Sequence, residues 1–129
     1  MLVVVDTNII VNALKSSDIH SKSMQLMNDL YNARHTMCVS SAIMEEYRDV
    51  LSRPQLGIDA SVMRELISWI DENAYHIEPL PTSDASVEMK DEDDRIFFDV
   101  AKCLNARLVT RNYKDYPVHE LITLIDELY

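Results

Sequence analysis

The chain has 129 residues, of which 47% are hydrophobic and 26% charged, and it contains one glycine, four prolines and two cysteines. This composition is typical of a single globular domain, and it leaves little room for a turn-rich β-sandwich or a disulfide-built scaffold. The formal net charge of −10 excludes nucleic-acid binding through bulk charge alone, so a polyanionic substrate would require metal ions or a local basic patch.

Apolar runs in the sequence are too short to form a transmembrane helix, and the first residues lack a basic and then apolar leader. We therefore expect a cytoplasmic protein without a membrane partner. Cys38 and Cys103 stand apart from each other, and the four histidines show no metal-ligand spacing. Neither a disulfide nor a Cys/His metal site is expected from this pattern.

Predicted strands and helices alternate along the chain, strands from short β-branched runs and helices from apolar residues at helical spacing. In chain order, they are a strand at 2–5, a helix at 9–14, a helix at 20–33, a strand at 36–39, a helix from 41 that stops before Pro54, a helix at 61–73, a weak edge strand at 76–78, a polar loop, a helix from 91 to about 105, and strands at 107–110 and 122–125. This alternation predicts a parallel α/β sheet. In the helix at 61–73, we expect Val62, Leu66, Trp69 and Ile70 to face inward.

The first predicted strand ends abruptly at a carboxylate, Asp6. Carboxyl ends of central parallel strands line the crevice in which α/β proteins bind ligands, and a charge buried there needs compensation. Thr7 and Asn8 add a hydroxyl and an amide that can orient Asp6 or cap the next helix. Taken alone, the pattern favours an Asp6 that serves only as an N-cap of the helix beginning near Ile9, and the remainder of the chain changes this balance.

A second carboxylate falls on the buried side of a predicted helix. Glu46 lies three residues after Ile43 and four before Val50, which places it on the apolar stripe. Its neighbour Glu45 falls on the solvated side. Helical spacing therefore selects Glu46 over Glu45 as the candidate site residue. The alternative is that Glu46 is a structural, salt-bridged carboxylate.

A run of four acidic residues opens the helix that ends near 105, and Asp94 extends its apolar stripe because it precedes Phe97 by three residues. Acidic residues in a first helical turn are expected from the helix macrodipole alone, so part of this run needs no functional explanation. Asp91 is a candidate for a supporting role. Polar groups also follow the strand at 107–110, which ends at Thr110 and is followed by Asn112 and Asp115.

Together these motifs give the chain a family resemblance over its whole length, residues 1–129. It resembles PIN-domain ribonucleases, of the kind that includes VapC-type toxins of bacterial toxin–antitoxin pairs. The resemblance rests on the order and spacing of short motifs, which are Val5–Asn8, Ser40–Glu46 with Val50 and Leu51, Asp94 with Ala101, and Leu108–Asn112 with Asp115. It implies a single PIN-like domain with a three-layer α/β/α fold around a central, mostly parallel sheet.

The resemblance also implies an activity, the metal-dependent hydrolysis of RNA phosphodiester bonds. Asp6, Glu46 and Asp94 would be ligands of Mg²⁺ or Mn²⁺, and the fourth acidic position would be Asn112 or Asp115. Hard divalent cations prefer such oxygen ligands and can activate water next to a phosphodiester. Thr7, Asn8, Asp91, Thr110 and Asn112 would support the site. The candidate RNA contacts are Arg48, Arg53, Arg111 and Lys114.

Two partners besides RNA follow from the resemblance and from the acidic net charge: a small antitoxin protein and a second copy of the chain. Two other classes of function stay open. One is a catalytically inactive PIN fold that acts as a binding module, which is favoured if Asn112 breaks the site. The other is a receiver-type signalling domain, which Asp6–Asn8 and the absence of lysine after Lys114 fit poorly.

Overall fold

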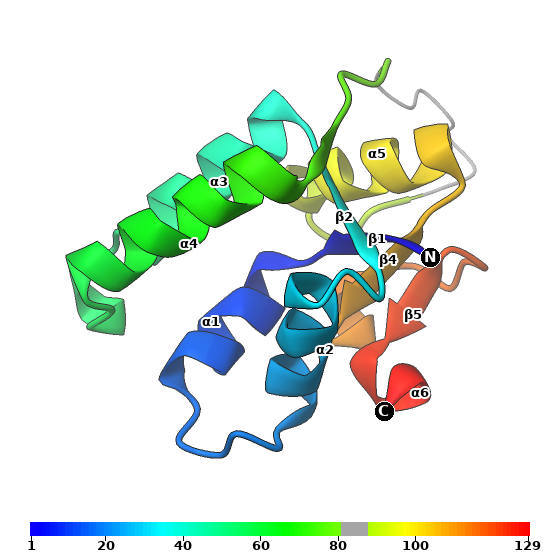
Figure 1. Ribbon diagram of the computed structural model, residues 1–129. Coiled ribbons are helices and arrows are strands. Elements are labelled where there is room, and N and C mark those ends of the chain that lie inside the picture. The colour runs from blue at the N-terminus through cyan, green and yellow to red at the C-terminus, as the bar shows by residue number, and fades with distance from the viewer. Residues whose placement is uncertain (81–87) are drawn as a thin grey trace.

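The computed structural model describes residues 1–80 and 88–129, and most of the polar loop expected before Asp91 lies outside these residues (Figure 1). The elements in chain order are β1 (Leu2–Val5), α1 (Thr7–Lys15), α2 (Lys22–Tyr31), β2 (Thr36–Val39), α3 (Ser41–Leu51), α4 (Ala60–Asn73), β3 (Tyr75–His76), α5 (Arg95–Leu104), β4 (Arg107–Thr110), β5 (Ile122–Leu124) and α6 (Ile125–Leu128). Short 3₁₀ helices occupy Pro54–Leu56, Glu92–Asp94 and Tyr113–Asp115.

The described strands form a five-stranded sheet in the order β3-β2-β1-β4-β5, and every pair is parallel. Helix α5 packs against β1, β2 and β4 on one face, with α3 beside it. Helices α1 and α2 pack together on the other face, where α6 contacts α2 (Figure 1). These three layers confirm the predicted α/β/α architecture and its parallel sheet.

The carboxyl ends of β1 and β4 are held side by side, and this pairing positions the residues that follow them. Val5 pairs with Val109, and the Asp6 N–H donates to the Val109 carbonyl oxygen over 3.0 Å. Helix α3 is tied to the same point because the buried Tyr47 hydroxyl donates to the Val5 carbonyl oxygen over 2.5 Å. Glu46, next to Tyr47 in the sequence, therefore lies near the end of β1.

Several helix starts follow from the expected capping chemistry. Asp6 caps α1, Ser40 caps α3 and Asp59 caps α4, each with a side-chain oxygen that accepts from a backbone N–H of the first turn. Helix α1 consequently begins at Thr7, two residues before the predicted start at residue 9. Apolar periodicity misses these two residues because Thr7 and Asn8 are polar.

Other differences lie at the edges of the fold. Strand β3 is Tyr75–His76 instead of 76–78, and Ile125 begins α6 instead of ending a strand. In α4, Ile67 and Ile70 form the buried side, whereas Val62 is 44% exposed. The expected inward position of Val62 is wrong because the first turn of α4 extends beyond the core. Within the described ranges, no helix has the length and apolar character needed to cross a membrane.

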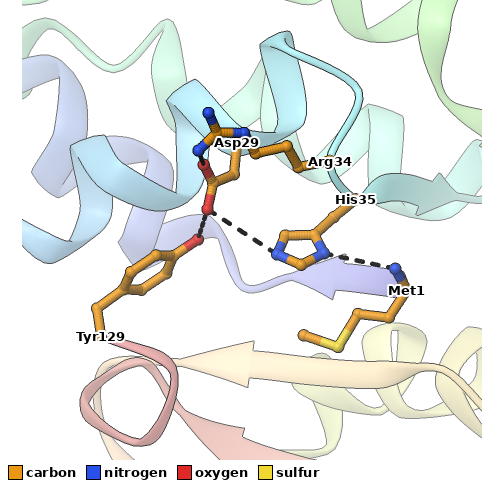
Figure 2. Close-up of polar contacts among 5 residues, drawn as sticks. All are labelled: Met1, Asp29, Arg34, His35 and Tyr129. Atoms are coloured by element: carbon orange, nitrogen blue, oxygen red, sulfur yellow. Dashed lines mark hydrogen bonds and ion pairs between the residues drawn. The ribbon is translucent and has the colours of Figure 1, made fainter.

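Figure 2 shows a polar cluster that joins the end of α2 and the residues after it to Met1 and to Tyr129, which follows α6. Asp29 accepts hydrogen bonds from the Tyr129 hydroxyl at 2.5 Å and from Arg34 at 3.1 Å, and His35 lies 4.0 Å from its carboxylate. The Tyr129 hydrogen bond lowers the pKa of Asp29. Because none of these residues lines the cleft described below, we interpret the cluster as structural.

Candidate active site

A cleft of about 580 Å³ opens where the carboxyl ends of β1 and β4 meet helices α1 and α3. It lies at the edge of the parallel sheet where α/β proteins bind ligands. Its lining residues are Asp6, Thr7, Asn8, Val11, Asn12, Lys15, Glu46, Val50, Arg53, Gln55, Leu56, Asp94, Arg111 and Asp115. The structure thus brings together the four carboxylates that the sequence singled out, with Asp115 and without Asn112.

Asp6 is the most deeply buried of the four carboxylates, with 6% of its surface exposed. It accepts a hydrogen bond from the Thr110 hydroxyl at 2.8 Å and a weak one from the Asn8 N–H at 3.4 Å. Burial raises the pKa of Asp6, and the Thr110 hydrogen bond opposes this shift. The buried Tyr116 hydroxyl faces the same carboxylate without a hydrogen bond of standard geometry. Thr110, a predicted supporting residue, therefore holds Asp6 directly.

Glu46 is half-buried on the α3 wall of the cleft, whereas Glu45 is exposed and lies outside it. Burial raises the pKa of Glu46, the Arg53 charge lowers it, and the Asp49, Asp93 and Asp6 charges raise it further. The structure therefore places the two neighbours as the helical phase predicts.

Asp94 sits at the junction between the 3₁₀ helix Glu92–Asp94 and α5. Burial, together with the charges of Asp6, Asp91, Asp115 and Glu46, raises its pKa to about 7. Both poor solvation of a carboxyl and negative groups at short range favour its protonated form. The carboxylates of the cleft thus form one electrostatic unit even though they come from four different segments.

The raised pKa of Asp94 predicts a pH-dependent loss of stability in metal-free protein. In the unfolded chain this carboxyl loses its proton near pH 3.8, but in the folded chain only near pH 7. The folded state therefore binds more protons between these values, and the free energy of unfolding falls as the pH rises through this window. Urea unfolding in EDTA from pH 4.5 to 8 should show a shallower fall for Asp94→Asn than for wild type. Parallel curves of unfolding free energy against pH for the two proteins would contradict the raised pKa of Asp94.

The turn after β4 places Asp115, and not Asn112, on the wall of the cleft. Asn112 is exposed, its N–H donates to the Thr110 hydroxyl over 3.2 Å, and its side-chain oxygen accepts from the Lys114 N–H at 3.1 Å. It shapes the turn that carries Asp115 to the cleft wall. Asp115 is thus the carboxylate that this turn contributes, and Asn112 acts on the backbone.

The remaining supporting candidates have different surroundings. The Thr7 hydroxyl and the Asn8 side-chain oxygen are buried in the cleft wall without a hydrogen-bond partner among the described residues. Unpaired buried oxygens are costly and call for a further partner such as water or an ion. Asp91 is exposed outside the cleft, where it caps the 3₁₀ helix through the Asp93 N–H. Its carbonyl oxygen accepts from the Asp94 N–H over 3.0 Å, and its charge helps to raise the pKa of Asp94.

Of the predicted RNA contacts, Arg53 and Arg111 line the cleft and Arg48 and Lys114 do not. Arg48 instead lies in a groove between α3 and α4. Three polar residues of the cleft were not predicted from the sequence: Asn12, Lys15 and Gln55. For two of them a signal was present, because Asn8, Asn12 and Lys15 follow one another at helical spacing and so share one side of α1.

The carboxylates share a cleft, but they do not form a ready-made cage. Among residues 1–80 and 88–129, no group of three His, Cys, Asp or Glu side chains is gathered closely enough to hold a metal ion. Ca²⁺ takes about six to eight oxygen ligands, waters among them, whereas Mg²⁺ keeps several waters and is held by one or two carboxylates plus substrate phosphates. The carboxylate oxygens of the cleft are of the kind that hard divalent cations prefer.

Comparison with known proteins gives a family match and a structural match. A family model described as PIN domain matches residues 2–114. The fold is similar to the crystal structure of VapBC2 from Rickettsia felis bound to a DNA fragment from its promoter, with a TM-score of 0.61 and 18% identity over 96% of this chain and 97% of that one. At this identity the likeness shows a shared fold. A search among curated proteins finds no match.

Proposed function

Because the chain belongs to the PIN-domain family, whose members are generally nucleases, we propose that it is a ribonuclease that depends on Mg²⁺ or Mn²⁺. The observation that carries this proposal is the cleft itself. Four carboxylates from separate segments line it, and three of them, Asp6, Glu46 and Asp94, have raised pKa values because of burial and mutual repulsion. Such repulsion is what a bound divalent cation would relieve.

The residues present fit a hard divalent ion. Asp6, Glu46, Asp94 and Asp115 would hold it, and the unpaired oxygens of Thr7 and Asn8 offer additional acceptors for its waters. When bound, the ion lowers the pKa of a coordinated water and neutralises charge on the phosphodiester.

The chain's own residues orient this chemistry. Thr110 fixes the Asp6 carboxylate, and Tyr47 fixes the helix that carries Glu46. Arg53 and Arg111 present guanidinium groups for the negatively charged strand. No histidine, cysteine or serine is among the described residues that line the cleft, and we assign the general acid–base role to its carboxylates.

Incubation with a mixed pool of RNA tests the proposal. The purified protein should cut RNA in the presence of Mn²⁺ or Mg²⁺ and leave it intact in EDTA. Single-stranded DNA of matched sequence serves as a control for substrate class. RNA that stays intact in millimolar Mn²⁺ would reject the proposed nuclease activity and favour an inactive PIN fold that acts as a binding module.

The finer part of the proposal is that the chain is the toxin of a toxin–antitoxin pair. It is supported by the motif pattern and by the similarity in fold to VapBC2. The net charge of −10 favours an antitoxin with a basic segment. Co-expression with the product of an adjoining short reading frame, followed by purification at low and high salt, should yield a complex. Absence of any complex would contradict this part alone.

A further inference from the structure

We infer that the outer end of the cleft is a subsite for a second phosphate of the RNA strand, formed by Lys15 and Arg53. The inference rests on the proposed ribonuclease function and extends it. It assigns to Lys15, Asn12 and Arg53 the task of holding the nucleotides next to the bond that is cut. The positions of charged and apolar side chains along the two walls of the cleft, formed by α1 and by α3 with the residues after it, support this assignment.

One wall of the cleft is a single side of α1. Asn8, Asn12 and Lys15 line the cleft at intervals of four and three residues, so they form a row along the helix. Asn8 is next to the carboxylate end because it directly follows Asp6 and Thr7. Lys15 lies at the other end of the row, in the last turn of α1, where the helix points away from the sheet (Figure 1).

The opposite wall repeats this arrangement. Glu46, Val50 and Arg53 line the cleft at the same four- and three-residue intervals along α3 and the residue pair that follows it. Glu46 belongs to the carboxylate end and Arg53 to the outer end. On each wall, a side chain with an oxygen ligand lies near the sheet, and a cation lies at the outer end seven residues later. The pairs are Asn8 with Lys15 and Glu46 with Arg53.

The distance between the two ends matches a short piece of RNA. On α1, Asn8 and Lys15 are seven residues apart and so about 10 Å apart along the helix axis. A stacked strand advances about 3.4 Å per nucleotide, so this length corresponds to about three nucleotides, and to fewer when the strand is extended. A strand with one phosphate at the carboxylates would therefore place another between Lys15 and Arg53.

The two cations are available to such a phosphate. Lys15 is exposed and makes no ion pair within the described part of the chain. Arg53 pairs with Asp49 over 2.9 Å, but both side chains are largely exposed, and exposed pairs contribute little to stability. Arg53 can therefore exchange this partner for a phosphate at small cost, and its planar guanidinium suits two phosphate oxygens.

The middle of the cleft suits the sugar or base between the phosphates. Val11 and Val50 face it from opposite walls, both half-buried, and Asn12 adds a half-buried amide with no hydrogen-bond partner among the described residues. Apolar walls with one amide match the face and edge of a nucleotide better than they match a second ion.

The test measures RNA binding in EDTA, where cleavage does not interfere, by fluorescence anisotropy of a short single-stranded oligonucleotide at several salt concentrations. For a single strand, a variant that no longer binds one of the phosphates should reduce the slope of log K against log salt by about 0.7. Lys15→Gln should show this reduction. Lys102→Gln, which makes the same charge change in the last turn of α5 and outside the cleft, should keep the wild-type slope.

A second comparison locates the phosphate. In a series of oligonucleotides, one phosphodiester at a time is replaced by a neutral methylphosphonate. At one linkage, this replacement should weaken RNA binding by wild type and leave RNA binding by Lys15→Gln unchanged. Equal reductions of slope in Lys15→Gln and Lys102→Gln, or linkage effects that persist in Lys15→Gln, would overturn the subsite. The proposed nuclease is judged separately, by whether wild type cuts RNA with Mn²⁺.

Discussion

Asp6→Asn and Asp94→Asn should each reduce Mn²⁺-dependent RNA cleavage on the order of 100-fold or more, with the fold intact. Loss of groups that merely support a metal ligand commonly costs about 10- to 100-fold, and these carboxylates are proposed as the ligands themselves. Asn keeps the shape of each side chain and removes only its charge. At position 6, Thr110 and the Asn8 N–H donate to different oxygens of Asp6, so the single Asn oxygen can keep only one of these two hydrogen bonds.

The control for this experiment is Asp93→Asn, which changes an exposed carboxylate immediately before Asp94 and outside the cleft. It should retain cleavage within a few-fold of wild type. Initial rates on a fluorescent RNA, together with circular dichroism in EDTA, give both readouts. Cleavage close to wild type in Asp6→Asn and Asp94→Asn would remove both residues from the proposed site.

Glu46→Gln should abolish cleavage to a similar extent, whereas Glu45→Gln should leave it nearly unchanged. The two residues are adjacent in sequence and carry the same charge, so bulk electrostatics affects both variants alike. They differ only in position on α3, with Glu46 in the cleft wall and Glu45 exposed beyond it. Single-turnover rates at saturating RNA compare the variants without interference from weaker binding. Equal activity in the two variants, or the reverse order, would contradict the placement of Glu46.

The central elements of the fold were predictable because their sequence patterns are strong. β1 is an uninterrupted apolar strand, β2 and β4 have apolar buried centres, and the spacing of Ile43 and Val50 on α3 fixes the side on which Glu46 lies. The same spacing separates Arg53 from Arg48, because Arg53 follows Glu46 by seven residues and shares its side. Proximity in sequence alone does not distinguish the two arginines, and only Arg53 lines the cleft.

Other features depend on geometry that no periodicity encodes. The choice between Asn112 and Asp115 rests on the turn after β4, where Asn112 bonds to the backbone and Asp115 reaches the cleft. Gln55 belongs to a 3₁₀ helix that begins at Pro54 and was not predicted. The two-residue β3 is also too short for its pattern to define its ends.

Thermal unfolding tests most directly whether the carboxylates of the cleft bind one divalent ion together, on which the proposed function depends. An ion that binds only the folded state adds about 2.7 kcal/mol at a hundred times its dissociation constant. For a domain of this size, that stabilisation raises the melting temperature on the order of several degrees. The asparagine variant at Asp6 should melt higher than wild type in EDTA, because burial of its charge is relieved, and should respond less to the ion.

Wild type and Asp6→Asn are therefore unfolded in EDTA, in millimolar Mn²⁺ and in NaCl of matched ionic strength. We predict a rise of several degrees for wild type in Mn²⁺ only, and a much smaller rise for Asp6→Asn. An equal rise in NaCl, or equal responses of the two proteins to Mn²⁺, would contradict shared binding of the ion by these carboxylates.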